Sequence, residues 1–236
     1  MIDLHTVSVI MAAAGNSGRM NGENKQLKLL SGIPVIIRSM LVFEQIDDIS
    51  EIIVSARECD IDKITSFSKK YNVTKLKAVV IGGETRQQSI FKALGKVSKE
   101  TELIAVHDGA RPLVSAEHIK QCIKDAVVFG ASTLGVPVKD TLKVVEGGLI
   151  VDTPDRRKLY ITQTPQIFRK KEYYAGVNFA LEHELDFTDD CQLAEAVGVK
   201  VNMTLSDYRN IKLTTPEDFA IAEAILNMGS DQVCSE

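Results

Sequence analysis

Two hydrophobic periodicities alternate along the chain as far as Val138, and this alternation constrains the fold more than any other feature. Short runs of apolar residues, typical of buried strands, take turns with longer segments whose apolar residues recur at helical spacing. We expect strands at residues 7–13, 51–56, 77–83, 102–108 and 132–138, separated by helices at 35–45, 60–71, 85–97 and 116–129. Such an order predicts an α/β fold with a mostly parallel sheet flanked by helices. Ligands of these sheets bind where the strands end, so the loops after the strands are the first places to look for a site.

The alternation breaks after Val138. Residues 141–146 and 149–153 read as two short strands joined by Gly147-Gly148, which is a hairpin signal. An inserted hairpin at residues 138–158 is either a plain excursion or an arm that packs on a second subunit. Because an isolated hairpin is only marginally stable, we favour the arm and expect a homodimer.

The remaining residues return to helices and one strand within a single domain, residues 1–236. We expect helices at 169–184, from Thr188 as the N-cap, and from Thr215-Pro216, with a strand at 199–205.

Composition excludes several classes of function. The formal net charge is -4 and the chain has no Trp, so neither general electrostatics nor base stacking favours nucleic acid as a partner. No apolar run approaches membrane-spanning length, and the N-terminus lacks the basic region of a signal peptide. The four cysteines are scattered without a CxxC pair and are expected to be reduced thiols. We therefore expect a cytoplasmic protein that does not bind a membrane.

A glycine-rich loop with the sequence AAAGNSGRM follows the first expected strand. Small residues such as Ala13, Ala14 and Gly15 let the backbone approach a ligand, and successive loop amides bind anions. Arg19 and Lys25 add two positive charges nearby. The loop alone fits a plain strand-to-helix turn, and it lacks both the Gly-Lys-Ser/Thr of a P-loop and the third glycine of a dinucleotide fingerprint. With its two cations it predicts a grip on a nucleoside triphosphate.

Two further loops follow expected strands. In GGETRQQS, the glycines free backbone groups to read a base edge, and Arg86 and Ser89 stand at the start of the next helix. In HDGARP, Asp108 ends a strand, where it can hold a metal or a substrate hydroxyl. Arg111 is at least as well explained as a structural partner of Asp108, and His107 is better explained as a structural histidine than as a base.

Later segments contribute a second pair of cations. These segments are PVKDT with Thr141, the DRR stretch with Arg156, TPQ with Thr164, TDD with Thr188, and IKLT with Lys212. Each alone fits a solvated surface. Together they supply Arg156, Lys212 and several hydroxyls, which is the set that binds a phosphate monoester.

The ordered set of motifs from Val7 to Met228 resembles the 2-C-methyl-D-erythritol 4-phosphate cytidylyltransferases of the non-mevalonate isoprenoid pathway. The resemblance implies a Rossmann-like fold, a homodimer joined through the hairpin arm, and a Mg²⁺-dependent reaction of CTP with the polyol phosphate. The products would be a CDP-linked methylerythritol and pyrophosphate.

Residue by residue, Arg19 and Lys25 match the family's pair that stabilises the transition state, and Arg156 and Lys212 match the pair that positions the substrate phosphate. The nucleotide-binding positions are Ala13, Ala14, Gly15, Gly83, Glu84, Arg86 and Ser89, and the substrate-binding positions are Asp108, Thr141, Thr164 and Thr188. Glu84 replaces the more usual Asp, which affects base selectivity if the contact uses the carboxylate. Thr141 and Arg156, being on the arm, are candidates for the partner subunit's site. The sequence assigns no residue to the metal.

The chemistry fits these residues independently. A phosphate monoester has a second pKa of about 6 and attacks without a general base, so cations rather than a catalytic triad are the expected machinery. The alternatives are a cytidylyltransferase for ribitol 5-phosphate or another polyol phosphate and, more distantly, a non-catalytic nucleotide-binding module.

Overall fold

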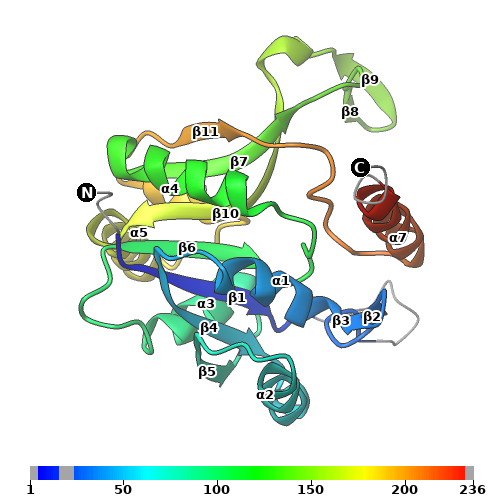
Figure 1. Cartoon of the computed structure of the whole chain (residues 1–236). Helices are drawn as coiled ribbons and strands as arrows, with labels where there is room; N and C mark the ends of the chain where they lie inside the picture. The colour runs from blue at the N-terminus through cyan, green and yellow to red at the C-terminus, as the bar shows by residue number, and fades with distance from the viewer. Residues whose placement is uncertain (1–4, 16–23, 232–236) are drawn as a thin grey trace.

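The central sheet places the ends of its parallel strands along one edge. The computed structural model describes residues 5–15 and 24–231, so the part of the glycine-rich loop after Gly15, with Arg19, lies outside the described residues. One sheet has the order β11-β7-β10-β6-β1-β4-β5 (Figure 1). Its strands are β1 (Val7–Ala13), β4 (Ile49–Ala56), β5 (Leu76–Ile81), β6 (Leu103–Asp108), β7 (Ala131–Pro137), β10 (Tyr160–Arg169) and β11 (Asn202–Leu205). Only β10 runs antiparallel to its neighbours within this sheet, which confirms the predicted mostly parallel α/β fold.

Helices cover both faces of this sheet and build two separate cores. One core joins the sheet to α1 (Val35–Glu44), α2 (Ile61–Lys70) and α4 (Ala116–Phe129). The other joins it to α3 (Arg86–Leu94), α5 (Lys170–Glu182) and α6 (Cys191–Ala196). A third cluster packs α7 (Pro216–Asp231) near the short pair β2 (Leu29–Leu30) and β3 (Ile33–Pro34). No helix in residues 5–15 and 24–231 has the length and apolar character needed to cross a bilayer.

Local sequence explains why these helices begin and end where they do. The Ser115 hydroxyl accepts a hydrogen bond from the His118 amide at the start of α4, and Gly130 ends that helix with φ of 92°. A left-handed residue after a helix is most easily a glycine, since it has no Cβ. The helix predicted at 116–129 therefore agrees with the structure.

Strand β10 was not predicted, because its sequence argues against a strand. It contains Pro165 in a cis peptide bond and the polar stretch Thr162–Gln166, whereas a proline within a run normally excludes a central strand. The register with β7 shifts between Thr162 and Gln166, so the proline interrupts the ladder without ending it. The stretch is not a solvated surface, since Gln163, Thr164 and Gln166 are all buried.

The prediction that Thr188 caps a helix was wrong. The helix α6 begins at Cys191, and the Gln192 amide donates to the Asp189 carboxylate at 3.2 Å. The Thr188 hydroxyl instead donates to the Gln192 side chain. Thr188 lies two residues before Asp190, which occupies the N-cap position of this helix.

The predicted hairpin is present as β8 (Val144–Glu146) and β9 (Leu149–Asp152), which form a two-stranded sheet of their own. Gly147 and Gly148 have φ of 56° and 82°, the backbone that a tight hairpin turn demands. Figure 1 shows this arm projecting away from the main sheet beyond β7. The side chains of Val145, Leu149 and Ile150 are exposed on it.

Candidate active site

A pocket of about 430 Å³ lies where β1, β4, β5 and β6 end. The chain passes from β1 to β4 and β5 on one side and returns to β6 on the other, so this is the point where the strand order reverses. Open α/β sheets bind ligands at such a point. The lining consists of Ala12, Ala14, Gly15, Lys25, Gln26, Ala56, Arg57, Ile81, Gly82, Gly83, Glu84, Thr85, Arg86, Ser89, Asp108, Ala110 and Lys212.

The pocket is cationic although the whole chain is acidic. Its lining includes the four basic residues Lys25, Arg57, Arg86 and Lys212, against the two acidic residues Glu84 and Asp108. The formal charge of the entire chain is -4. A concave surface with a local excess of positive charge attracts polyanions such as nucleotide phosphates.

The GGETRQQS loop forms one wall and is held open by its own side chains. The Gly83 amide donates to Ser89 Oγ at 2.9 Å, and the Glu84 amide donates to Gln88 Oε1 at 3.0 Å. A Cβ on Gly82 would lie 2.3 Å from the Ala14 Cβ, so the loops after β5 and β1 touch at this glycine. The Glu84 side chain is exposed.

Asp108 collects three cations at the end of β6. Its carboxylate lies 2.9 Å from Lys212 Nζ, 3.4 Å from Arg111 Nε and 3.7 Å from Arg86 Nε. Burial acts to raise the pKa of Asp108, but the charges of Lys212, Arg86 and Arg111 outweigh it and hold that pKa well below its usual range. The group is therefore a carboxylate, and the interpretation of Arg111 as its structural partner agrees with the structure.

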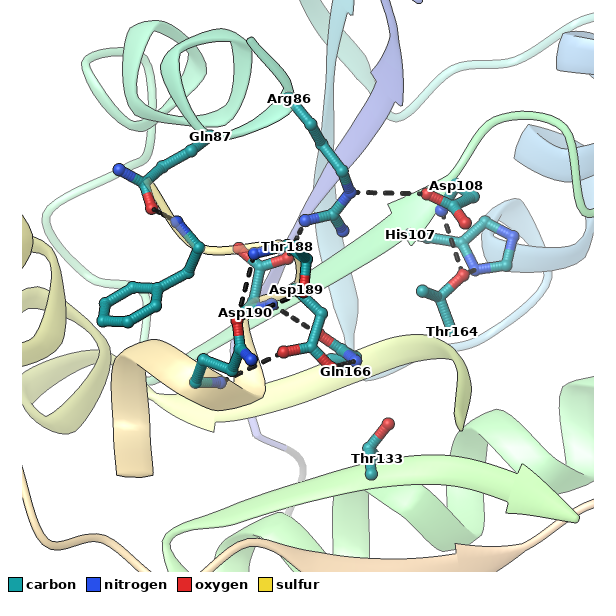
Figure 2. Close-up of polar contacts among 12 residues, drawn as sticks. Arg86, Gln87, His107, Asp108, Thr133, Thr164, Gln166, Thr188, Asp189 and Asp190 are labelled. Carbon is teal, nitrogen blue, oxygen red and sulfur yellow. Dashed lines mark hydrogen bonds and ion pairs between the residues drawn. The ribbon is translucent and has the colours of Figure 1, made fainter. Parts of the chain in front are cut away.

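A buried layer fixes Asp108 from below. The Asp108 amide donates to Thr164 Oγ1 at 3.0 Å, and the same hydroxyl lies 3.0 Å from His107 Nδ1 (Figure 2). Complete burial lowers the pKa of His107 to about 4, so the ring is neutral near pH 7. His107 is a structural histidine, as predicted.

Lys212 reaches the site on a strap that crosses the end of β6. The buried side chain of Asn210 donates to the Gln163 side chain and the Thr164 carbonyl, both at 3.0 Å. The Leu213 amide donates to the Ala110 carbonyl at 2.8 Å. These bonds fix both sides of Lys212 and explain how a residue so late in the chain enters the pocket.

The structure brings together most of the predicted site residues. Those in the lining are Ala14, Gly15, Lys25, Gly83, Glu84, Arg86, Ser89, Asp108 and Lys212. Ala13 is buried in β1, and Thr164 lies beneath the lining.

The other predicted residues lie elsewhere. Thr141 and Arg156 are exposed on the arm, where Arg156 donates to the Lys139 carbonyl, and neither lines the pocket. Thr188 lines a different cavity of about 280 Å³.

The sequence did not predict three residues that line the pocket or support its lining. Arg57 lines the pocket directly after β4, and its position behind a strand is a signal that could have found it. Gln26 also lines it, and its Oε1 is buried without a hydrogen-bond partner among the described residues. Asp190 pairs with Arg86 at 2.6 Å, a contact between distant segments that no local pattern reveals.

A cationic pocket at the point where the strand order of an α/β sheet reverses is typical of nucleotide-binding enzymes, and the comparisons with known proteins make the class a nucleotidyltransferase. Residues 7–228 match the family of 2-C-methyl-D-erythritol 4-phosphate cytidylyltransferases. An enzyme of that name from Caldanaerobacter subterraneus is 45% identical over 93% of this chain and 98% of its own length. The Bacillus licheniformis enzyme of the same name is 42% identical over 92% of this chain and 94% of its own.

A solved structure gives the same result. The 4-diphosphocytidyl-2C-methyl-D-erythritol synthase of Anaerococcus prevotii superimposes with a TM-score of 0.85 at 32% identity, covering 96% of this chain and 98% of that one. The chain belongs to the 2-C-methyl-D-erythritol 4-phosphate cytidylyltransferase family.

Proposed function

We propose that the protein transfers the cytidylyl group of CTP to 2-C-methyl-D-erythritol 4-phosphate, giving a CDP-linked methylerythritol and pyrophosphate. Membership of the family and the names of its relatives support this activity. The observation that carries it in the structure is the pocket itself, where residues of the GGETRQQS loop, Lys25 and Lys212 line one cationic cavity.

The reaction needs charge neutralisation more than proton transfer. An oxygen of the acceptor phosphate attacks the α-phosphorus of CTP, and the bond from that phosphorus to the β-phosphate oxygen breaks to release pyrophosphate. The acceptor is largely dianionic at neutral pH, since its second pKa is about 6. Two anions must therefore meet, and fixed cations stabilise the charge that accumulates between them.

The cations divide between the two substrates in this proposal. Lys25, together with Arg19 from outside the described residues, faces the triphosphate. Lys212 faces the acceptor phosphate and is oriented by Asp108. Arg156 projects from the arm, so it would serve the acceptor in the partner subunit's pocket.

The proposed reaction requires Mg²⁺, which would enter the pocket bound to the nucleotide phosphates. The described residues contain no cluster of three or more His, Cys, Asp or Glu that could hold a metal ion. The Asp108 carboxylate and Gln26 Oε1, which has no hydrogen-bond partner in the described part of the chain, are the oxygens that would hold Mg²⁺ in the pocket. A small number of protein ligands is enough for Mg²⁺, because this ion takes its other ligands from substrate phosphates and water. When bound, it would neutralise phosphate charge.

The proposal also includes a homodimer and a cytoplasmic location. The exposed apolar side chains of the arm support the dimer, since a lone hairpin gains little stability from facing water. The cytoplasm supplies CTP and Mg²⁺.

A panel of acceptors tests the reaction. The protein is mixed with CTP, Mg²⁺ and either methylerythritol phosphate or ribitol 5-phosphate, and pyrophosphate release is followed. We expect release with methylerythritol phosphate at a far higher rate. Faster release with ribitol 5-phosphate would favour the related enzyme, and CTP binding without release from any acceptor would favour a non-catalytic module.

A further inference from the structure

A buried chain of polar contacts leads from α5 to the wall of the pocket. The Tyr173 hydroxyl donates to Asp190 Oδ1 at 2.6 Å, and Arg86 Nη1 donates to Asp190 Oδ2 at 2.6 Å. Tyr173 is fully buried and Asp190 is 2% exposed, whereas Arg86 lines the pocket. Asp190 therefore lies behind the described lining of the ligand cavity and contacts that lining through Arg86.

The Asp190 carboxylate has little freedom to turn. Gln166 accepts from the Asp190 amide at 2.9 Å and donates to the Asp189 carboxylate at 3.2 Å, so one side chain holds two consecutive residues (Figure 2). With both carboxylate oxygens and the amide engaged, the position of Asp190 is determined from three directions. A group held this firmly can orient a flexible arginine.

The same segment also grips the neighbours of Arg86. The Thr85 hydroxyl donates to Asp186 at 3.1 Å, and the Gln87 side chain bonds to the Leu185 carbonyl and the Phe187 amide. Gln87 is drawn beside Arg86 in Figure 2. Together these contacts join the start of α3 to the segment before α6. The N-cap and the first two residues of α3 are thus held by three consecutive side chains.

Arg86 has two acidic partners, and they pull in different directions. Its Nη1 is 2.6 Å from Asp190, while its Nε is 3.7 Å from Asp108 across the pocket floor. A mostly buried guanidinium does not stay unpaired, because desolvation without a partner is costly. If Asp190 lost its charge, we expect the Arg86 guanidinium to turn toward Asp108, its other acidic partner, and to lose its present orientation in the pocket wall.

We propose that Asp190, anchored by Tyr173 and Gln166, is a positioning residue that holds Arg86 in the orientation in which it binds the nucleotide. This role rests on the proposed function, since it takes CTP as the ligand of the pocket. Asp190 itself touches no substrate.

The test is a double-mutant cycle on the full-length protein, with Asp190→Asn, Arg86→Gln and the double variant. CTP binding is measured by calorimetry and turnover by pyrophosphate release. We expect Asp190→Asn to weaken CTP binding and raise KM for CTP on the order of 10- to 100-fold, with a much smaller change in kcat at saturating CTP. In the Arg86→Gln background the same substitution should cost almost nothing, because it acts only through Arg86.

A merely structural role gives a different result. Loss of folded protein lowers kcat through the active fraction and leaves KM unchanged. An equal penalty in both backgrounds, or unchanged CTP affinity in Asp190→Asn, would overturn the proposal.

Tyr173→Phe keeps the test decisive if Asp190→Asn does not fold. It removes one hydroxyl and keeps the ring, and it should raise KM for CTP in the same direction by a smaller factor. Tyr174→Phe is its matched control, since it removes the next hydroxyl on α5, whose bond to the Leu94 carbonyl lies away from Asp190. Equal KM values in the two variants would contradict the proposal.

CTP binding by the unaltered protein distinguishes failure of the positioning role from failure of the proposed function. Unaltered protein that binds no CTP contradicts the proposed function and, with it, this role. Unaltered protein that binds CTP while Asp190→Asn binds it equally well contradicts the positioning role alone.

Discussion

Lys212 Nζ lies 2.9 Å from the Asp108 carboxylate, which joins a strap late in the chain to the end of β6. The lysine side chain is 40% exposed, so its ammonium also faces the pocket, whereas the carboxylate is nearly buried. Asp108 Oδ2 orients the Lys212 ammonium, and the exposed side of that ammonium is available to a ligand. The pair thus turns a mobile lysine into a fixed phosphate-binding group.

Lys212→Ala should separate binding from turnover. Because Lys212 is assigned to the acceptor phosphate, the variant should bind CTP normally and lose turnover by roughly 10²- to 10³-fold, the usual effect of removing one preorganised donor. Calorimetry with CTP and a pyrophosphate assay measure the two effects. Lys120→Ala, which removes an exposed lysine of α4, is the control and should change neither. Loss of CTP binding in Lys212→Ala would show that the cations are not divided between the substrates as assigned.

Gly82→Ala should damage the nucleotide wall. The added methyl would lie 2.3 Å from the Ala14 Cβ and 2.9 Å from Ser89 Oγ, so the loops after β1 and β5 must separate. We expect CTP binding to weaken by at least about tenfold, since backbone displacements of this size disturb bound geometry. Gly95→Ala serves as the comparison, because its new methyl meets only the Lys92 carbonyl at 3.5 Å. Similar CTP affinity in both variants would argue against close contact between the loops.

Stability should fall in acid as Glu51 takes up a proton. Burial acts to raise the pKa of Glu51, but hydrogen bonds from Lys77, Ser98 and Ser8 outweigh it and lower the pKa to about 2 from its ordinary 4.5. The folded state thus binds the proton more weakly than the unfolded state. The contribution is complete above about pH 4.5 and is lost as pH falls toward 2, amounting to about 3 kcal/mol.

Denaturant unfolding between pH 7 and pH 2.5 checks this contribution. Glu51→Gln should be less stable at pH 7, and its free energy of unfolding should fall less steeply between pH 4.5 and 2.5. Parallel curves for the two proteins would contradict the assignment.

The arm should be required for dimers and for turnover. Replacing Leu149 and Ile150, which are 73% and 62% exposed on β9, by Ser removes apolar surface without touching the main sheet. We expect monomers by light scattering and a loss of turnover, because Thr141 and Arg156 then serve no partner site. Val128→Ser, at a residue 68% exposed on α4, should leave the oligomeric state unchanged. A fully active monomer from the arm variant would contradict the role of the partner's arm.

Sequence periodicity predicted those elements whose burial follows a simple pattern. The strand at 7–13 and the helix at 116–129 match because one lies in the middle of a parallel sheet and the other has clear capping residues. β10 was missed because polar residues and Pro165 occupy a buried strand, where their hydrogen bonds are made to the strap and to Asp108. The sequence patterns that predict buried strands are built on apolar residues. They therefore miss a strand whose buried polar residues form hydrogen bonds with distant parts of the chain.

In the candidate site, too, local patterns were predictable and contacts between distant segments were not. Loops directly after strands were predicted to meet, since parallel strands end at one edge, and Gly83 and Asp108 do line one pocket. The buried contact of Asp190 with Arg86 was not predicted, because it joins residues 104 positions apart without a shared pattern. The sequence predicts Thr164 as a substrate contact, and the structure adds that its hydroxyl accepts from the Asp108 amide.

Phosphorus NMR of the reaction mixture tests the central claim most directly. The protein is incubated with equimolar CTP, methylerythritol phosphate and excess Mg²⁺, and all phosphorus signals are followed together. We predict that CTP and the phosphate monoester disappear in equal amounts while a diphosphate diester and pyrophosphate appear in the same amounts. Unchanged CTP and monoester signals at high protein concentration, or release of inorganic phosphate in place of pyrophosphate, would contradict it.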